Sequence, residues 1–222
     1  MSDRHTAPAG EGFLDGLAAQ AILPLLTVPG PLGAADLGAA LVRAGLPIIE
    51  VAIRRPGAVD ALAEIASVGG AFVGAGSVRS AAQVDEVVGA GARFVISPGF
   101  SPAVATACAD HGLPLIPGVA TASEILAALD LGLEVLKFFP AATSGGVAAL
   151  AAFAGPFPEV RFIPTGGIGE ANAAGYLDLP NVIAVGGSWL VAGDVLARGD
   201  LDGIADAAAR ALAALSRRSR ER

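Results

Sequence analysis

Residues 133–140 read Leu-Glu-Val-Leu-Lys-Phe-Phe-Pro, one of eight short apolar runs that alternate with alanine-rich segments of helical pattern. The run places a single cation, Lys137, among side chains that favour a buried strand. Lys137 is also the only lysine, because the other cations among the 14 lysines and arginines are all arginine. This stretch therefore belongs to the strand pattern that decides the fold, and it carries a residue that packing alone does not explain.

The alternation of apolar runs and helical patterns continues along the chain at a regular spacing. The apolar runs predict eight strands, at residues 22–27, 47–53, 72–75, 93–97, 113–117, 133–138, 160–164 and 182–185. A short amphipathic segment at residues 12–20 precedes them, and the remaining patterns predict helices at residues 34–44, 58–68, 81–90, 102–110, 122–131, 147–154, 170–177 and 201–216. Eight strand–helix units in 222 residues predict an α/β fold, a single (β/α)8 TIM barrel.

An open doubly wound sheet is the competing architecture for alternating strands and helices. Such a sheet usually carries a glycine-rich phosphate-binding turn after its first strand. Here the first predicted strand continues as Val28-Pro29-Gly30-Pro31, which lacks that fingerprint, so the sequence favours the barrel.

Composition and charge limit the class of protein and its partners. A hydrophobic content of 54% supports a large core, and we expect one barrel domain at residues 13–216 between a flexible N-terminal tail (1–12) and a basic C-terminal tail (217–222). The net charge of -7 argues against nucleic acid and anionic membranes as partners. A single cysteine, Cys108, and an N-terminus without a secretion signal predict a cytoplasmic protein.

Lys137 is the predicted nucleophile. Burial penalises the ammonium form, and a lysine can lose its proton whereas an arginine cannot. The neutral amine attacks carbonyl carbon, so a lysine held in an apolar strand suits imine formation. The alternative is a lysine at a strand end whose head group reaches water while its stem is buried.

A carboxylate and a guanidinium follow in the second predicted strand, where residues 48–54 read Ile-Ile-Glu-Val-Ala-Ile-Arg. Because side chains alternate along a strand, Glu50, Ala52 and Arg54 share one face, and we expect that face to point into the barrel. Charged groups there are costly unless they are paired or used. The functional interpretation gives Glu50 the proton transfers and Arg54 the grip on a substrate carboxylate. The alternative is a structural ion pair.

Paired glycines end the last two predicted strands. Pro164-Thr165-Gly166-Gly167 ends the seventh, and Gly186-Gly187-Ser188 ends the eighth. Many TIM barrels bind phosphate at these places through backbone N–H groups. The alternative is that the glycines serve the turns alone. Ser77 after the third strand and Pro98 after the fourth are weaker candidates, since both are ordinary turn residues.

The two histidines narrow the chemistry further. His5 lies in the predicted tail and His111 stands apart from it, so the sequence offers no histidine cluster for a zinc site or a hydrolase triad. We therefore expect no metal and no cofactor. An amine, a carboxyl group, an anion clamp and a phosphate site together suit imine chemistry on a keto-acid phosphate.

Six motifs connect the chain to a known family. They are Glu-Val-x-x-Arg at 50–54, Val-Gly-Ala-Gly-Ser-Val at 73–78, Ile-Ser-Pro-Gly at 96–99, Lys-Phe-Phe-Pro-Ala at 137–141, Pro-Thr-Gly-Gly-Ile at 164–168 and Gly-Gly-Ser-Trp at 186–189. With these motifs the chain, over about residues 22–212, resembles the family of 2-keto-3-deoxy-6-phosphogluconate (KDPG) and 4-hydroxy-2-oxoglutarate (KHG) aldolases.

The resemblance implies a Schiff-base (class I) aldolase that cleaves KDPG to pyruvate and glyceraldehyde 3-phosphate, works without a cofactor and forms a homotrimer. It implies that Lys137 forms the imine and that Glu50 moves the protons. Arg54 and Ser77 are then expected to hold the substrate carboxylate. The remaining substrate-binding residues implied by the motifs are Pro98, Phe139, Thr165, Gly166, Gly167, Gly187 and Ser188.

Two departures from the common family motifs leave the substrate preference open. Relatives commonly have threonine at the positions of Ala52 and Ser77; serine keeps the hydroxyl, whereas Ala52 removes a possible hydrogen bond near Glu50. The alternatives within the family are the galactonate epimer of KDPG and KHG as substrates, although Gly-Gly-Ser-Trp and Lys-Phe-Phe-Pro-Ala favour the gluconate branch. The alternatives outside it are a catalytically silent sugar-phosphate-binding barrel and a barrel isomerase that forms no imine.

Overall fold

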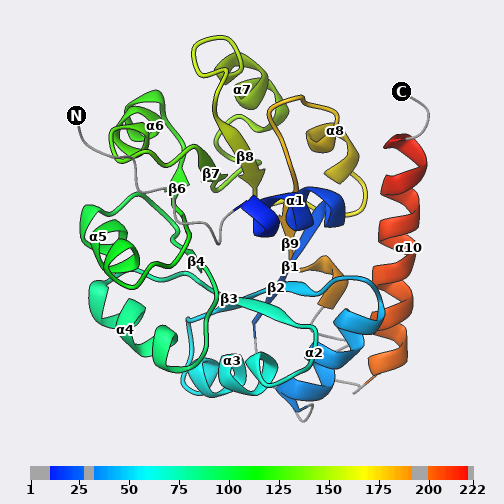
Figure 1. Cartoon of the computed structure of the whole chain (residues 1–222). Coiled ribbons are helices and arrows are strands. Elements are labelled where there is room, and N and C mark those ends of the chain that lie inside the picture. Colours follow the sequence, from blue (N-terminus) through cyan, green and yellow to red (C-terminus); the bar gives the residue numbers. More distant parts are fainter. Residues whose placement is uncertain (1–10, 28–32, 192–199, 220–222) are drawn as a thin grey trace.

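Parallel strands surrounded by helices form a barrel in the computed structural model, which describes residues 11–27, 33–191 and 200–219 (Figure 1). The strands are β1 Ile22–Leu26, β2 Ile48–Ala52, β3 Phe72–Gly76, β4 Val95–Ile96, β5 Leu115–Ile116, β6 Gly118–Val119, β7 Val135–Phe138, β8 Arg161–Pro164 and β9 Val185–Gly187. The helices are α1 Glu11–Gln20, α2 Ala34–Arg43, α3 Ala58–Ala66, α4 Ala81–Gly89, α5 Pro102–Asp110, α6 Ala122–Leu129, α7 Gly146–Phe153, α8 Ala173–Leu177 and α10 Leu201–Ser219, with a 3-10 helix η1 at Trp189–Val191.

The strands close on themselves. One parallel sheet has the order β5-β4-β3-β2-β1-β9, and a second has the order β6-β7-β8. β5 leads directly into β6 through Pro117, and on the other side the bridge between Thr165 and Gly186 joins the end of β8 to β9. The predicted TIM barrel is therefore confirmed, and the open doubly wound sheet is excluded.

The fifth predicted strand is interrupted. Residues 113–117 were expected to form one strand, but β5 and β6 lie on either side of Pro117. Proline has no N–H to donate to a neighbouring strand. Its carbonyl still accepts the Lys137 N–H at 2.9 Å, so the pairing of β6 with β7 begins at the lysine.

The seventh predicted helix begins later than its pattern suggested, at Ala173 rather than at residue 170. Asn172 closes a turn before it, because its Oδ1 accepts the Gly169 N–H and its Nδ2 donates to the Gly167 carbonyl, both at 2.9 Å. An asparagine side chain that binds nearby backbone groups competes with the helix. Residues 1–10 and 220–222 of the predicted tails lie outside the described residues.

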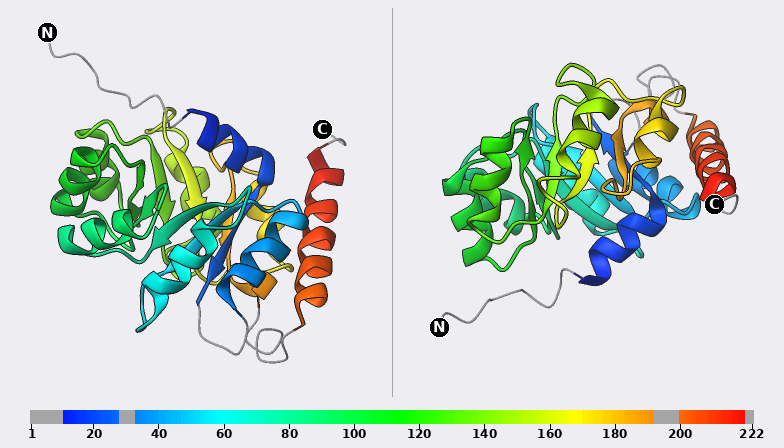
Figure 2. Two further views of the ribbon diagram at one scale, coloured as in Figure 1. Left: turned by 60° about the horizontal axis from the view of Figure 1, so that its bottom comes forward. Right: turned by 90° about the horizontal axis from the view of Figure 1, so that it is seen from above.

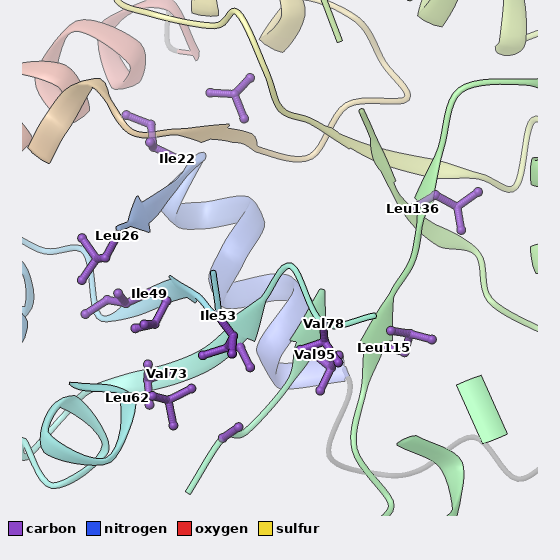
Figure 3. Packing of buried hydrophobic residues seen from close by; sticks show 14 of the residues in the cluster. Ile22, Leu26, Ile49, Ile53, Leu62, Val73, Val78, Val95, Leu115 and Leu136 are labelled. Atoms are coloured by element: carbon purple, nitrogen blue, oxygen red, sulfur yellow. The ribbon is translucent and has the colours of Figure 1, made fainter. Parts of the chain in front are cut away.

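Apolar side chains form an outer layer between the strands and the helices and an inner layer within the barrel. Figure 3 shows part of the outer layer, in which Ile49 and Val73 of neighbouring strands lie close to Leu62 of α3. The inner layer consists of Phe13, Leu17, Leu23, Ile48, Phe94, Ile96, Ile116, Ile163 and Ala184. Figure 2 shows α10 on the outside of the barrel, next to α2.

Helix α1 closes the N-terminal end of the barrel, and Figure 1 shows it across the centre of the ring of helices. The Phe13 ring stacks on Phe94 and on Phe72, with centroid distances of 4.6 and 5.1 Å. Gln20 fixes the end of the helix, since its side chain donates to the Ile22 and Ile48 carbonyls at 2.7 and 2.8 Å. Any site of catalysis within the barrel must therefore lie at the opposite end.

No helix among the described residues is both long and apolar enough to cross a membrane.

Cys108 of α5 provides a test of the packing. Its side chain is buried, and burial raises the pKa of the thiol from 9.0 to about 12. Because the thiolate is the reactive form, we expect thiol reagents at pH 8 to label the folded protein at least about 10³-fold more slowly than the unfolded protein. Labelling rates with and without guanidinium measure the difference, and Cys108→Ala gives the background. Rapid labelling of the folded protein would contradict the buried position.

Candidate active site

Most of the buried polar side chains gather at the C-terminal ends of the barrel strands. Seven polar or charged residues are buried in the part of the chain that the structure describes, and five of them lie in or directly after β2, β3, β4, β7 and β8, namely Glu50, Ser77, Ser97, Lys137 and Thr165. TIM-barrel enzymes carry their catalytic groups at this end. The C-terminal end of the barrel is therefore the candidate active site.

The centre of this site is an ion pair between Lys137 of β7 and Glu50 of β2. Lys137 Nζ donates to Glu50 Oε1 at 3.2 Å, and the two side chains are 2% and 0% exposed. Glu50 Oε2 is also buried and has no hydrogen-bond partner among the described residues. A buried carboxylate with one unsatisfied oxygen is costly. The pair thus holds a carboxyl group within proton-transfer distance of the amine and leaves one oxygen for a substrate.

The register of β7 explains why the amine points inward. Leu136 and Phe138 belong to the outer apolar layer, so alternation turns Lys137 to the inside of the barrel. Lys137 pairs with Gly118 of β6. A side chain on Gly118 would overlap the backbone of Pro98, so the predicted substrate-binding residue Pro98 lies against the strand next to the lysine.

Gly76 makes the space for the Glu50 carboxylate. It is the last residue of β3, and a side chain there would overlap that carboxylate. In the sequence, Gly76 stood out only as part of the motif at residues 73–78. The signal for its specific role is the spacing of Gly74 and Gly76, which places both glycines on the inner face beside Glu50.

Arg54 lies two residues beyond the end of β2 and is exposed, so it does not form the buried structural ion pair with Glu50 that was the alternative. β2 ends at Ala52, and the Arg54 N–H donates to the Ala52 carbonyl at 2.9 Å, which turns the chain out of the strand before the arginine. The side chain is exposed, and Glu50 pairs with Lys137 instead. Arg54 Nε donates to Ser77 Oγ at 2.7 Å. The structure therefore brings together the two residues that were expected to hold a carboxylate.

Ser77 has an unusual backbone for a residue that is not glycine. Its φ is 63°, in the left-handed region, and its side chain is buried. Such conformations are uncommon outside glycine and occur often at functional sites. Ser77 directly follows Gly76, so the last residue of β3 lies against the Glu50 carboxylate and the next residue accepts a hydrogen bond from the Arg54 guanidinium.

Phe139 and Thr165 lie on the other side of the site. The Phe139 ring centroid is 5.4 Å from Lys137 Nζ. Thr165 extends the β7–β8 pairing, because its N–H donates to the Phe138 carbonyl at 2.9 Å. A side chain on Gly186 would overlap Thr165 Oγ1, so the threonine side chain lies against β9.

The two glycine pairs lie at neighbouring strand ends, joined by the bridge between Thr165 and Gly186. Gly166 and Gly167 have φ values of 99° and 74°, which favour glycine whatever binds there. Gly187 is buried, and a side chain on it would overlap the ring of Trp189. Ser188 between them is exposed. The turn itself requires Gly166 and Gly167, so the phosphate interpretation needs its own test.

The comparison with protein families agrees with this geometry. The family model described as KDPG and KHG aldolase matches residues 15–207. The chain belongs to the KDPG and KHG aldolase family. The prediction of a Schiff-base aldolase is thereby confirmed at the level of the family.

Individual members of the KDPG and KHG aldolase family are similar over most of their length. A KHG/KDPG aldolase of Escherichia coli (strain K12) is 46% identical over 192 residues, which cover 86% of this chain and 90% of that protein. A KDPG aldolase of Legionella pneumophila, in which pyruvate was captured at low pH as a covalent carbinolamine, has a TM-score of 0.85 and 39% identity, covering 89% and 97% of the two chains. A Zymomonas mobilis KDPG aldolase with 3-phosphoglycerate has a TM-score of 0.85 and 38% identity, covering 90% and 95%.

The described part of this aldolase family member contains no group of three or more His, Cys, Asp or Glu side chains that could hold a metal ion. His111 pairs with Asp85, with Nε2 and Oδ1 2.7 Å apart, on the exposed side of α4 and α5. The groups that the site does bring together are an amine, a carboxyl group, a guanidinium and a hydroxyl, which can form an imine and move protons next to it.

Proposed function

We propose that this member of the family cleaves KDPG to pyruvate and glyceraldehyde 3-phosphate through an imine on Lys137. The observation that carries the proposal is the buried contact between Lys137 Nζ and Glu50 Oε1 at 3.2 Å. It joins the only lysine of the chain to a carboxyl group that can accept and return protons. The carbinolamine of pyruvate in the Legionella relative supports covalent chemistry of this kind.

Imine formation starts with a proton transfer within the ion pair. Glu50 takes a proton from the Lys137 ammonium, and the neutral amine adds to the C2 ketone to give a carbinolamine. Glu50 then returns its proton to the C2 hydroxyl, which leaves as water, and the nitrogen becomes a protonated imine. The nitrogen carries one positive charge as the ammonium at the start and one as the protonated imine at the end, and Glu50 is a carboxylate in both states. The pair therefore needs no further proton donor.

The protonated imine then accepts the electrons of the breaking bond. The Glu50 carboxylate removes the C4 hydroxyl proton, and its unpartnered oxygen Oε2 is free to do so. The C3–C4 bond breaks and glyceraldehyde 3-phosphate leaves. The electron pair of the broken bond converts the protonated imine into a neutral enamine. Glu50 returns the proton to C3, and water hydrolyses the resulting imine to release pyruvate and the Lys137 amine.

Substrate orientation is assigned to groups around this pair. Arg54 and Ser77, which contact each other at 2.7 Å, bind the substrate carboxylate. Pro98, Phe139 and Thr165 border the reacting carbons. Backbone N–H groups of Gly166, Gly167 and Gly187, with the Ser188 hydroxyl, bind the phosphate. We further assign a homotrimeric, cytoplasmic enzyme that uses no cofactor, on the basis of the family resemblance and the sequence.

A direct comparison of substrates tests the proposal. KDPG, its galactonate epimer and KHG are offered at equal concentrations, and pyruvate release is followed with lactate dehydrogenase. We expect KDPG to have the largest kcat/KM. A larger value for either alternative substrate would reassign the substrate, and absence of turnover with all three would indicate a silent binding protein. Borohydride with pyruvate separates an aldolase from an isomerase, because only the imine is trapped.

The phosphate site is tested by Gly167→Ala. We expect kcat/KM for KDPG to fall by roughly 10- to 100-fold, the effect of one or two lost charge-assisted hydrogen bonds, because the added methyl stands where backbone must approach the anion. For the same substrate without its phosphate group, kcat/KM should fall much less. The ratio of kcat/KM for the two substrates measures the effect.

Ala142 supplies the matched control for this variant. A side chain on Gly167 would come within 2.5 Å of Ala142 Cβ, so overlap with that methyl is a second reason for damage. In Gly167→Ala/Ala142→Gly the overlap is gone, and the selective loss with KDPG should persist. If both substrates are affected equally, or if pyruvate trapping is lost as well, the glycines serve the turn and the phosphate binds elsewhere.

A further inference from the structure

The Phe139 ring lies beside the amine that carries the positive charge of the reaction. Its centroid is 5.4 Å from Lys137 Nζ, within the range of a cation–π contact. Phe139 directly follows the end of β7, and the contact itself places its ring on the same side of the chain as Lys137, while Phe138 between them belongs to the outer apolar layer. The ring is half-buried and the amine is 2% exposed, so little water weakens the contact.

The other partner of the amine changes its charge during the reaction. Among the described residues, the ion pair with Glu50 is the one that Lys137 forms. Glu50 loses its negative charge each time it accepts a proton, whereas the negative face of an aromatic ring is permanent. In the proposed sequence the nitrogen is cationic only while Glu50 is ionised, so the ring adds to the stabilisation by the carboxylate, and its charge distribution does not change with the proton transfers.

We propose that Phe139 is a catalytic residue whose π face stabilises the protonated imine on Lys137. The inference rests on the proposed function and goes beyond a role for Phe139 as a wall of the substrate site. The carbinolamine that precedes the imine and the enamine that follows it are neutral at nitrogen. The ring therefore favours the charged imine over both neighbours, and it raises the fraction of bound substrate that is ready for bond cleavage.

Packing offers a different role for the same ring. A side chain on Gly166 would come within 3.3 Å of Phe139 Cδ2 and Cε2, so the ring also lies against the turn assigned to the phosphate. An apolar side chain of similar volume would serve that packing role equally well. Only the electrostatic role depends on the electron density of the ring, and this difference makes the proposal testable.

The experiment replaces Phe139 by phenylalanines with one, two and three ring fluorines, introduced by site-specific incorporation. Fluorine withdraws electron density and nearly preserves the shape of the ring. Pyruvate is saturating, so that the imine is compared only with the carbinolamine and the enamine, which are both neutral at nitrogen, and the rate of borohydride trapping on Lys137 is measured. We expect a stepwise fall across the series that reaches roughly 2- to 30-fold, the range of a partly to fully desolvated cation–π contact.

Phe138 supplies the matched control. Its ring is buried and makes edge-on contacts with Phe153 and Phe162, at centroid distances of 6.2 and 6.4 Å, away from the amine. The same fluorinated series at position 138 should leave trapping unchanged. Phe139→Leu, which removes the ring but fills much of its volume, should slow trapping as much as the trifluorinated variant does, with thermal unfolding as the check on folding.

The outcomes separate this inference from the proposed function. Trapping on Lys137 that is insensitive to fluorination at position 139 overturns the role of the ring and leaves the aldolase mechanism intact. Equal decreases at positions 138 and 139 also overturn it, because the effect would then be one of packing. Absence of trapping on Lys137 in the unmodified protein would contradict the imine mechanism and, with it, the role of Phe139.

Discussion

Replacement of Lys137 by arginine is expected to abolish borohydride trapping of pyruvate and to reduce turnover of KDPG on the order of 10⁶-fold, the scale observed when an enzyme loses its covalent nucleophile. Arginine keeps a positive charge near Glu50, so the buried carboxylate retains a partner. It cannot lose its proton, so it cannot attack a ketone. Mass spectrometry of the trapped protein and a coupled turnover assay measure the two effects.

A second variant tests whether misfolding explains the loss of activity in Lys137→Arg. Lys137→Met alone would leave Glu50 as an uncompensated buried charge, which typically costs about 3–5 kcal/mol of stability. Lys137→Met/Glu50→Gln removes both charges and should fold while remaining inactive. In the unmodified protein, peptide mapping should place the pyruvate adduct on Lys137. An adduct on another residue, or trapping that persists in Lys137→Arg, would refute the assignment of the nucleophile.

Glu50→Gln is expected to lower turnover by roughly 10²–10⁴-fold, the usual loss for an acid–base group. The amide oxygen can still accept a hydrogen bond from Lys137 Nζ, so the pocket keeps its shape and pyruvate should still bind. Single-turnover measurements with KDPG should show slow bond cleavage rather than weak binding.

A second test is Gly76→Ala, which keeps the glutamate but adds a methyl that overlaps its carboxylate. This variant should lose activity because the Glu50 carboxylate must move. We expect the loss to be smaller than in Glu50→Gln, since the carboxyl group is still present. Near-normal turnover of Glu50→Gln would return Glu50 to a structural role as the partner of the lysine.

The barrel could be predicted from periodicity because its strands are buried and its helices are amphipathic. Two of the differences in element boundaries depend on particular atoms. Pro117 interrupts the fifth strand because it has no N–H, although its carbonyl still pairs with β7. Asn172 delays the start of α8 through two side-chain hydrogen bonds, which an apolar pattern does not reveal.

Within the site, the sequence indicated the residues whose burial is costly. Lys137 and Glu50 stand out because charged groups are rare in apolar strands. The partner of Arg54 could not be predicted, because β2 ends at Ala52 and the guanidinium beyond the strand lies beside Ser77 rather than Glu50. The left-handed backbone of Ser77 could not be predicted either, since sequence propensity assigns that conformation to glycine.

The glycines around the site also show which positions tolerate substitution in enzyme engineering and which do not. At Gly76 and Gly186 no space is left for a side chain, which would overlap Glu50 at the first position and Thr165 at the second. Libraries that vary these positions would consist mostly of damaged proteins. Gly99, in the turn after β4, has open space where its side chain would be and no positive φ. Diversity intended to retarget the substrate is therefore better placed in that turn than in the walls of the barrel.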